Sequence, residues 1–137
     1  MQRDAIVALI DVYYRSRLAN DVDRCVAHFA PDASIRIAGS HDASPIAGSS
    51  SGPMAVRRQT MELIGSWQWL SMRIESMTIE GDRAAVHFQL TTRFQPTGDV
   101  VSSELLDLLT VRDGKIVSLV EFVDTALVAL LVAKTTR

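Results

Sequence analysis

The sequence predicts an α+β fold in which three N-terminal helices pack on a curved, mostly antiparallel β-sheet. Two observations lead to this prediction. Residues 1–66 carry apolar side chains at helical spacing, and residues 67–123 contain four strand-like runs separated by turn signals. With 137 residues, 47% of them hydrophobic and 22% charged, the chain is long enough to bury a core, and we expect one domain over residues 1–137.

The N-terminal half is expected to be mainly helical. We expect helices at residues 4–19, 22–29 and 53–66 and one short strand at residues 34–38. The first helix has a wide apolar stripe and should be well buried. Residues 39–53 are rich in Gly, Ser, Ala and Pro, which predicts a long and mobile loop. Pro53, preceded by Gly52, suits the first turn of the third helix.

The C-terminal half is expected to form the sheet. We expect strands at residues 67–80, 83–94, 100–111 and 115–123. In the first of them the apolar positions change from even to odd numbers, which predicts a bulge near Glu75-Ser76. Asp124 or Thr125 can cap a last helix that runs through Val132. Both faces of the last two strands are apolar, so we expect helices on one face and, most simply, a second copy of the chain on the other.

Two carboxylates in the most apolar stretch are the strongest functional signal. Asp107 has two leucines on each side, and Glu121 lies between apolar neighbours in the next strand. Whether they share a face depends on the hairpin loop, because a shift of one residue reverses every side chain. A two-residue turn at Asp113-Gly114 would place Asp107 opposite Val120 and would turn Glu121 to the other face.

We favour a three-residue loop, Arg112-Asp113-Gly114, with the glycine in the bulge position. In this register Asp107 lies opposite Leu119, and Glu121 is diagonally across from Asp107 on the same face. A carboxylate among leucines is costly unless it is paired, hydrogen-bonded or protonated. Two of them on one buried face therefore indicate acid/base chemistry or recognition of a polar ligand.

The composition argues against several kinds of site. A net charge of −2 with scattered basic residues gives no electrostatic reason to expect nucleic acid or an anionic membrane as a partner. The apolar stretch 116–133 contains Glu121 and Asp124 near its centre, which argues against a membrane span. The single Cys25 excludes an internal disulfide, and the three histidines lack metal-ligand spacing, so we expect no metal site. The N-terminus leads into a helix without a signal peptide, and we expect a cytoplasmic protein.

Several segments along the chain match the pattern of a known family. They are Asn20-Asp21, residues 28–33, Gly48, Gly52, residues 80–84, residues 112–117 and residues 121–124. With them the chain resembles the nuclear transport factor 2-like superfamily, and within it the SnoaL-like and ketosteroid-isomerase-like branch. The resemblance covers nearly the whole chain. It implies a cone-shaped pocket between helices and sheet and a homodimer through the outer sheet face, whereas the reaction stays open because the fold hosts several enzyme types and non-enzymes.

Individual family positions carry over unevenly. In steroid-isomerase-like members, a helix-one Tyr and a protonated strand Asp hold the substrate oxygen. The resemblance assigns these positions to Tyr13 and Asp107. Ile37 stands where the general base is expected, so simple ketosteroid isomerisation is not expected unless Glu121 replaces that base from another wall.

Two other branches of the family are matched only in part. In limonene-epoxide-hydrolase-like members an Asp-Arg-Asp set activates water. Asp107 and Glu121 match the two acids, whereas Leu105 occupies the Arg position. Dehydratase-like members use histidines on the long strands, where His87 is the only candidate, and the sequence leaves open which face it points to.

The leading hypothesis is a cofactor-free lyase, isomerase or hydrolase acting on a largely apolar, oxygenated small molecule. Asp107 would donate to the substrate oxygen or activate a water, Glu121 would be the partner base, and Tyr13 would orient the oxygen. Residues expected to line the pocket are Tyr14, Trp67, Trp69, His87, Leu105, Leu119 and Val123. The second hypothesis is a non-catalytic ligand-binding or dimerisation module, and a less favoured third is a protein-interaction adaptor.

Overall fold

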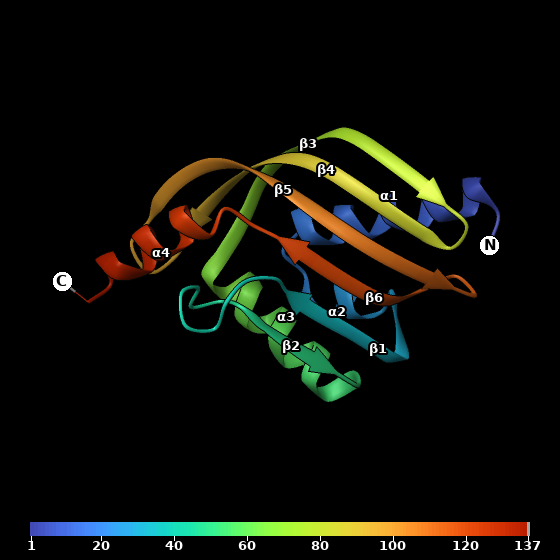
Figure 1. Cartoon of the computed structure of the whole chain (residues 1–137), viewed down its shortest axis with the longest axis horizontal. Coiled ribbons are helices and arrows are strands. Elements are labelled where there is room, and N and C mark those ends of the chain that lie inside the picture. The colour runs from blue at the N-terminus through green and yellow to red at the C-terminus, as the bar shows by residue number, and fades with distance from the viewer. Residues whose placement is uncertain (137) are drawn as a thin grey trace.

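The computed structural model describes residues 1–136 and has an α+β fold with helices packed on a curved, open, six-stranded sheet (Figure 1). The helices are α1 (Arg3–Leu18), α2 (Val22–Val26), α3 (Pro53–Ser66) and α4 (Thr125–Lys134). The strands are β1 (Phe29–Ile37), β2 (Gly48–Ser51), β3 (Trp67–Glu80), β4 (Arg83–Phe94), β5 (Asp99–Arg112) and β6 (Lys115–Phe122). The predicted fold class is confirmed.

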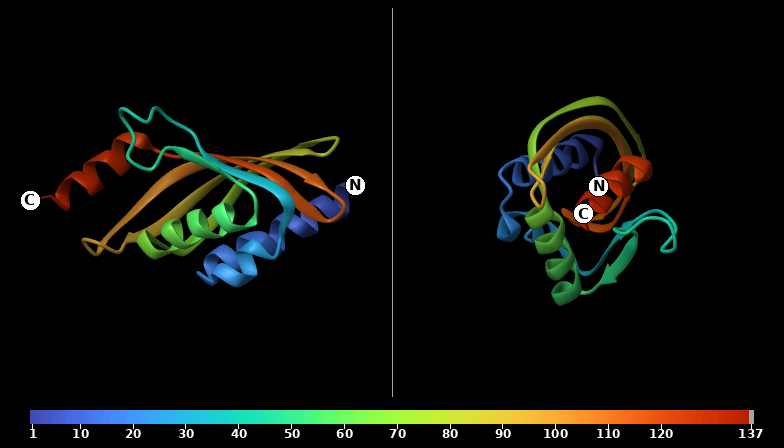
Figure 2. Two further views of the ribbon diagram at one scale, coloured as in Figure 1. Left: turned by 90° about the horizontal axis from the view of Figure 1, so that it is seen from below. Right: turned by 90° about the vertical axis from the view of Figure 1, so that its left-hand side faces the viewer.

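The sheet has the strand order β2-β1-β6-β5-β4-β3, in which only β1 and β6 run parallel. The register of β3 against β4 shifts between Ile74 and Ser76, which confirms the predicted bulge, and a second shift lies between Trp69 and Ser71. Such bulges bend and twist a strand. Seen end-on, the strands accordingly curl into an arc, with α4 in front of it (Figure 2, right).

The helices differ from prediction at one point, and one strand was missed. The second helix ends at Val26 because the chain enters β1 at Phe29, which pairs with β6. Within the expected loop 39–53, Gly48–Ser51 form β2 and pair with β1. A strand of Gly and Ser has no apolar alternation to reveal it. The predicted cap is confirmed: the Asp124 carboxylate accepts a hydrogen bond of 3.0 Å from the Leu127 amide.

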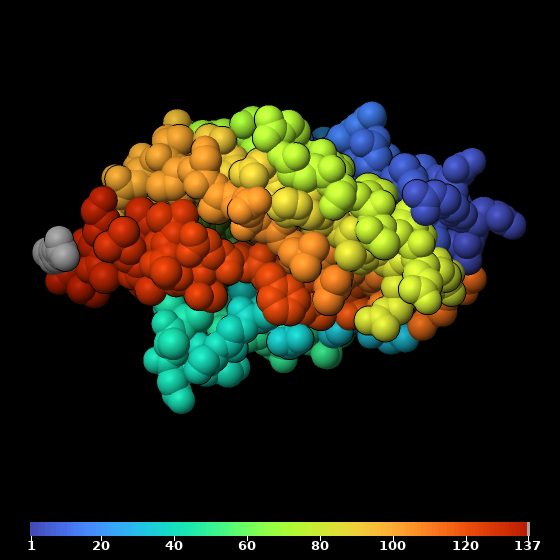
Figure 3. Space-filling view, turned by 45° about the horizontal axis from the view of Figure 1, so that its top comes forward, coloured from blue at the N-terminus to red at the C-terminus, as the bar shows by residue number. Residues whose placement is uncertain are grey.

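The core lies between the concave face of the sheet and helices α1 and α3. Ile6 and Ile10 of α1 are fully buried in the same core cluster as Val86 and Phe88 of β4. Seen from below, these helices lie on one side of the long strands only (Figure 2, left). On the other side, the side chains of β4 and β5 are not covered by any helix or loop (Figure 3). This uncovered side is called the outer face below.

None of the helices within residues 1–136 is long and apolar enough to cross a membrane.

Candidate functional site

The turn between β5 and β6 differs from the prediction. Arg112 pairs directly with Lys115, so the loop has two residues, Asp113 and Gly114, and not three. Both loop residues have positive φ angles, 50° and 78°. Positive φ at both positions is the mark of the tight hairpin turn whose twist matches that of the strands. The favoured three-residue loop is therefore wrong.

The two carboxylates nevertheless share a face, because β6 contains a bulge. Thr110 pairs with Ser118 and Val111 pairs with Ile116, which leaves Val117 as an extra residue. The two-residue turn alone would point Glu121 to the face opposite Asp107. The extra residue shifts the later part of β6 by one position, so that Glu121 points to the same face as Asp107. Asp107 consequently lies directly opposite Glu121, closer than the predicted diagonal arrangement.

Asp107 is the most deeply buried acid described in the structure. Its side chain has no exposed surface, and its Oδ2 accepts a hydrogen bond of 2.7 Å from the Tyr14 hydroxyl. Burial raises the pKa of Asp107 well above its ordinary value, and the neighbouring charge of Glu121 and a hydrogen bond with that carboxyl raise it further. The Tyr14 hydrogen bond and the charge of Arg17 oppose this rise without cancelling it. Burial and the neighbouring Glu121 therefore favour the protonated form of Asp107.

The position of the proton follows from the remaining contacts. Oδ1 of Asp107 is buried, and no donor among residues 1–136 reaches it. A protonated Oδ1 needs no donor and can itself donate, and Glu121 lies directly opposite Asp107 on β6. Tyr14, Asp107 and Glu121 therefore form a row of three polar side chains with Asp107 in the middle.

The tyrosine assignment has to be corrected. Tyr14, and not Tyr13, contacts Asp107, while Tyr13 packs edge-on against Phe29 with ring centroids 5.6 Å apart. Both tyrosines are buried, at 4% and 2% exposure, but only Tyr13 of the two lies on the wall of the cavity described below. The sheet curls round α1 and covers more than one helical row of side chains. Burial raises the pKa of each hydroxyl well above its ordinary value, so both are neutral donors.

Arg17 was missed by the sequence analysis. It lies on α1 one turn after Tyr13, is 5% exposed, and places its guanidinium carbon 4.3 Å from the centre of the Trp69 ring. The Asn20 side chain holds the backbone of Trp69 in place. Its amide nitrogen donates to the Trp69 carbonyl at 3.1 Å, and its amide oxygen accepts from the Trp69 N–H at 3.0 Å. Its spacing could have indicated that Arg17 is buried, because Arg17 continues the helical row of apolar residues that includes Ile10 and Tyr13.

Two small, partly open pockets lie beside the carboxyl pair, and together they are called the cavity and its two lobes below. The larger lobe, of about 50 Å³, is lined by Arg17, Ile46, Leu63, Trp67, Trp69, Leu90, Thr92, Val101, Ser103, Leu105, Glu121, Val123, Asp124, Leu127 and Val128. The smaller lobe, of about 10 Å³, is lined by Tyr13, Arg17, Ile35, Ile37, Thr60, Leu63, Leu119 and Glu121. Both lobes therefore meet Arg17 and Glu121.

Asp107 and Tyr14 line neither lobe, which changes the expected roles. Glu121 stands between the cavity and Asp107, so a ligand would contact Glu121 first. Direct donation from Asp107 to a substrate does not fit this arrangement. Asp107 and Tyr14 support Glu121 from behind.

The expected pocket residues separate into two groups. Trp67, Trp69, Leu105 and Val123 line the larger lobe, and Leu119 lines the smaller one. His87 is on the outer face, where its Nε2 lies 3.0 Å from Glu104, so the assignment of His87 to the pocket is wrong. On β4 the even-numbered residues are buried and the odd-numbered ones are not.

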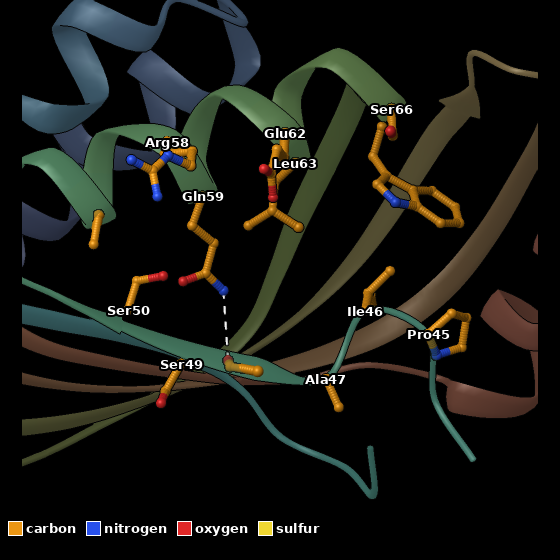
Figure 4. A pocket seen from close by; sticks show the side chains of 13 residues that line it. Pro45, Ile46, Ala47, Ser49, Ser50, Arg58, Gln59, Glu62, Leu63 and Ser66 are labelled. Atoms are coloured by element: carbon orange, nitrogen blue, oxygen red, sulfur yellow. Dashed lines mark hydrogen bonds between the residues drawn. The ribbon is translucent and has the colours of Figure 1, made fainter. Parts of the chain in front are cut away.

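A wider groove of about 390 Å³ opens beside the larger lobe (Figure 4). One wall is α3, from which Gln59 and Leu63 extend, and Gln59 donates a long hydrogen bond of 3.5 Å to the Gly48 carbonyl. On the other wall Ile46 points back toward the helix (Figure 4). Ile46, Leu63 and Trp67 line both the groove and the larger lobe, so they form the partition between them.

Within residues 1–136, no three side chains of His, Cys, Asp or Glu gather closely enough to hold a metal ion.

Comparisons with known proteins agree with this architecture. Residues 10–119 match the family model of the SnoaL-like domain, and no curated protein matches the sequence. A proposed isomerase from Rhodopseudomonas palustris is 18% identical with a TM-score of 0.77, with 100% of both chains covered. A proposed isomerase from Bacillus subtilis is 15% identical with a TM-score of 0.83, covering 96% of this chain and 94% of the other. A proposed polyketide cyclase from Sinorhizobium meliloti is 24% identical with a TM-score of 0.64, covering 83% and 93%.

Proposed function

The chain belongs to the SnoaL-like domain family, and from this premise we propose that it is a small-molecule enzyme of isomerase, cyclase or lyase type working by proton transfer. The observation that carries the proposal is the buried carboxyl pair, in which Asp107 holds a proton directly behind Glu121 at the cavity wall. Solved structures of this fold that carry the names isomerase and polyketide cyclase support the reaction type.

In the proposed reaction Glu121 is the group that touches the substrate. Its carboxylate takes a proton from a carbon beside a carbonyl group, the C–H electron pair moves into the new C=C bond, and the carbonyl oxygen gains the negative charge. Glu121 then returns the proton at another position, so no oxidant or reductant is needed. Between the two steps Glu121 is a neutral carboxylic acid. Asp107 supports the Glu121 carboxylate before the proton is taken and after it is returned, and the Tyr14 hydroxyl fixes Asp107 by its hydrogen bond.

The cavity constrains the size of the substrate. A buried water needs roughly 10–15 Å³ of such volume, so the larger lobe, of about 50 Å³, has room for only a few heavy atoms. A larger substrate requires the walls to move apart. The groove beside the larger lobe offers a path, because Ile46, Leu63 and Trp67 line both the groove and the lobe that Glu121 meets. We therefore propose that substrates enter through this groove.

An Ile46→Ala variant should open this partition. Ile46 is half-buried, so the loss of stability should stay below about 2 kcal/mol, under the cost of truncating a fully buried isoleucine. With Trp67→Phe as background, Trp69 is the single tryptophan, and its fluorescence should be quenched more strongly by acrylamide after the change. Met61→Ala, on an exposed position of α3, is the matched control. Equal quenching in both variants would show that the groove is not the entrance.

Proton transfer can be tested before the natural substrate is known. Small enolisable ketones such as cyclopentanone and acetylacetone are incubated with the protein in deuterium oxide, and exchange at carbon is followed by proton NMR. We expect exchange above the buffer rate that Glu121→Gln abolishes. Exchange that is equal with and without protein, or unaffected by the substitution, would contradict the proposal.

A non-catalytic ligand-binding module is the second candidate. It is favoured by Ile37, which occupies the position where the resemblance leads one to expect a general base and which lines the smaller lobe. Saturable binding of a small ligand without exchange in the deuterium experiment would support this candidate over the enzyme.

We also propose that the outer face binds a second copy of the chain. Leu106 and Leu108 of β5 and Val120 of β6 are only partly buried there, and Phe122 is 43% exposed. The face is hollowed by depressions of about 350 and 650 Å³, and no other element covers it (Figure 3). A stable dimer of standard size buries on the order of 800 Å² per partner.

A charge at the centre of that face should prevent association. In Leu108→Asp an acidic group enters an apolar contact, and each copy carries the same charge, so we expect a monomer at concentrations where the wild type is a dimer. Sedimentation velocity measures this directly. Met61→Asp places the same charge on α3 and should leave the dimer intact. A monomeric wild type at high micromolar concentration would contradict the proposal.

A further inference from the structure

Arg17 is a buried cation that forms no ion pair within 4.0 Å among the described residues. Only 5% of its surface is exposed, its Nη1 is buried without an acceptor, and no side-chain hydrogen bond or ion pair joins it to any of residues 1–136. The Trp69 ring beneath it contributes a cation–π contact but accepts no N–H hydrogen bond in the plane of the guanidinium. A buried charge in this condition is strongly unfavourable unless something else compensates it.

The position of Arg17 on the cavity wall shows that a ligand in the cavity could supply the missing hydrogen-bond acceptor. Arg17 and Glu121 are shared by both lobes of the cavity, so a ligand in either lobe meets the guanidinium and the carboxyl pair together. The rest of the wall is largely apolar, including Leu63 and Leu105. The missing acceptor is needed already in the resting protein, before any reaction could create negative charge.

We propose that Arg17 binds the carboxylate of a small organic acid, whose apolar remainder lies in the larger lobe beside Glu121. A planar guanidinium matches a carboxylate with two parallel N–H···O bonds, and the match is stronger than with a neutral oxygen. The inference names the substrate class of the function proposed above and rests on it.

Acetate and acetamide are the probes, because they have the same shape and four heavy atoms each, which suits the larger lobe. The indole N–H signal of Trp69, assigned with a Trp67→Phe variant, reports binding by proton–nitrogen NMR. We expect acetate to bind at least about tenfold more tightly than acetamide, because a hydrogen bond between two charged groups is stronger than one between a charged and a neutral group. The preference should disappear in Arg17→Met and persist in Arg15→Met, which removes an exposed cation of the same helix.

Thermal unfolding provides a second readout that a structural role for Arg17 would not share. Without ligand, Arg17→Met should unfold at the same temperature as the wild type or higher, because an uncompensated charge is replaced by an apolar side chain. Acetate should raise the unfolding temperature of the wild type only. If Arg17→Met is clearly less stable, or does not fold, the guanidinium is already compensated within the protein and the inference is overturned. Arg17→Lys should fold and keep part of the preference for acetate.

The outcomes separate this inference from the proposed function. If acetate binding depends on Arg17 but no carbon exchange occurs in deuterium oxide, the carboxylate site is supported and the proposed enzymatic function is contradicted. If exchange depends on Glu121 but acetate and acetamide bind equally well, the enzymatic function is supported and the carboxylate site is overturned.

Discussion

Replacement of Asp107 by Asn should remove a pH dependence of stability that the wild type carries. In the unfolded chain this carboxyl loses its proton near its ordinary value of 3.8, whereas in the folded protein burial and Glu121 raise its pKa well above that value. Between these two values the folded state holds one more proton than the unfolded state. Wild-type stability should therefore fall by about 1.4 kcal/mol per pH unit as the pH rises from about 4 to the folded pKa.

The sign follows from which form is favoured by folding. The stabilising contribution of the Asp107 proton is complete below pH 3.8 and is lost as the pH rises through the raised folded value. His28 acts in the opposite direction, because burial lowers its pKa and stability therefore rises toward pH 6.5. Since His28 is common to both proteins, the difference in unfolding free energy between wild type and Asp107→Asn isolates the carboxyl.

Urea unfolding at half-unit intervals from pH 4.5 to 8.5 measures that difference. Tyr14→Phe is the matched control, because its hydroxyl lowers the pKa of Asp107 while burial and Glu121 raise it. This variant should keep the slope and extend it to higher pH. A difference between wild type and Asp107→Asn that is independent of pH would show that Asp107 is ionised in the folded protein, and the proton-sharing pair would then be wrong.

The hairpin shows how far local sequence rules reach. The apolar runs on either side of Asp113-Gly114 indicate two strands and their alternation, and these were predicted correctly. The prediction placed the extra residue in the loop, whereas it lies at Val117 inside β6. Turn and bulge compensate each other, so the shared face of the carboxylates was predicted correctly from the wrong loop. A bulge of this kind leaves no composition signal, since Val117 is an ordinary strand residue.

The positions of Arg17 and Tyr14 could not be predicted from the sequence. A sequence reading treats Arg17 as exposed because arginine usually is, and its neighbour Tyr13 was preferred to Tyr14 through the family resemblance. The choice between these side chains depends on how the curved sheet wraps round α1, which is a property of the whole fold. His87 lies on the outer face because odd-numbered residues of β4 point there. Which of the two alternating sets of β4 side chains points outward is decided only by the pairing of β4 with β5.

Replacement of Glu121 by Gln should have the largest effect on activity. The amide keeps the shape of the side chain and its place on the wall of both lobes but cannot accept a proton at the reaction's pH. General-base catalysis contributes about 10²–10⁴-fold, so exchange or turnover should fall by that factor while the fold is retained. The same change removes the neighbouring charge that raises the pKa of Asp107, so the pH dependence of stability described above should shift to lower pH.

The double variant Asp107→Asn/Glu121→Gln distinguishes a coupled pair from two independent acids. If Asp107 acts only through Glu121, the double variant should be no slower than Glu121→Gln alone, because residues that work as a unit have non-additive effects. Glu104→Gln is the matched control, since Glu104 is an acid of the outer face paired with His87 and should be kinetically silent. Multiplicative losses in the double variant would mean that Asp107 reaches the substrate by itself, which the cavity described here does not allow.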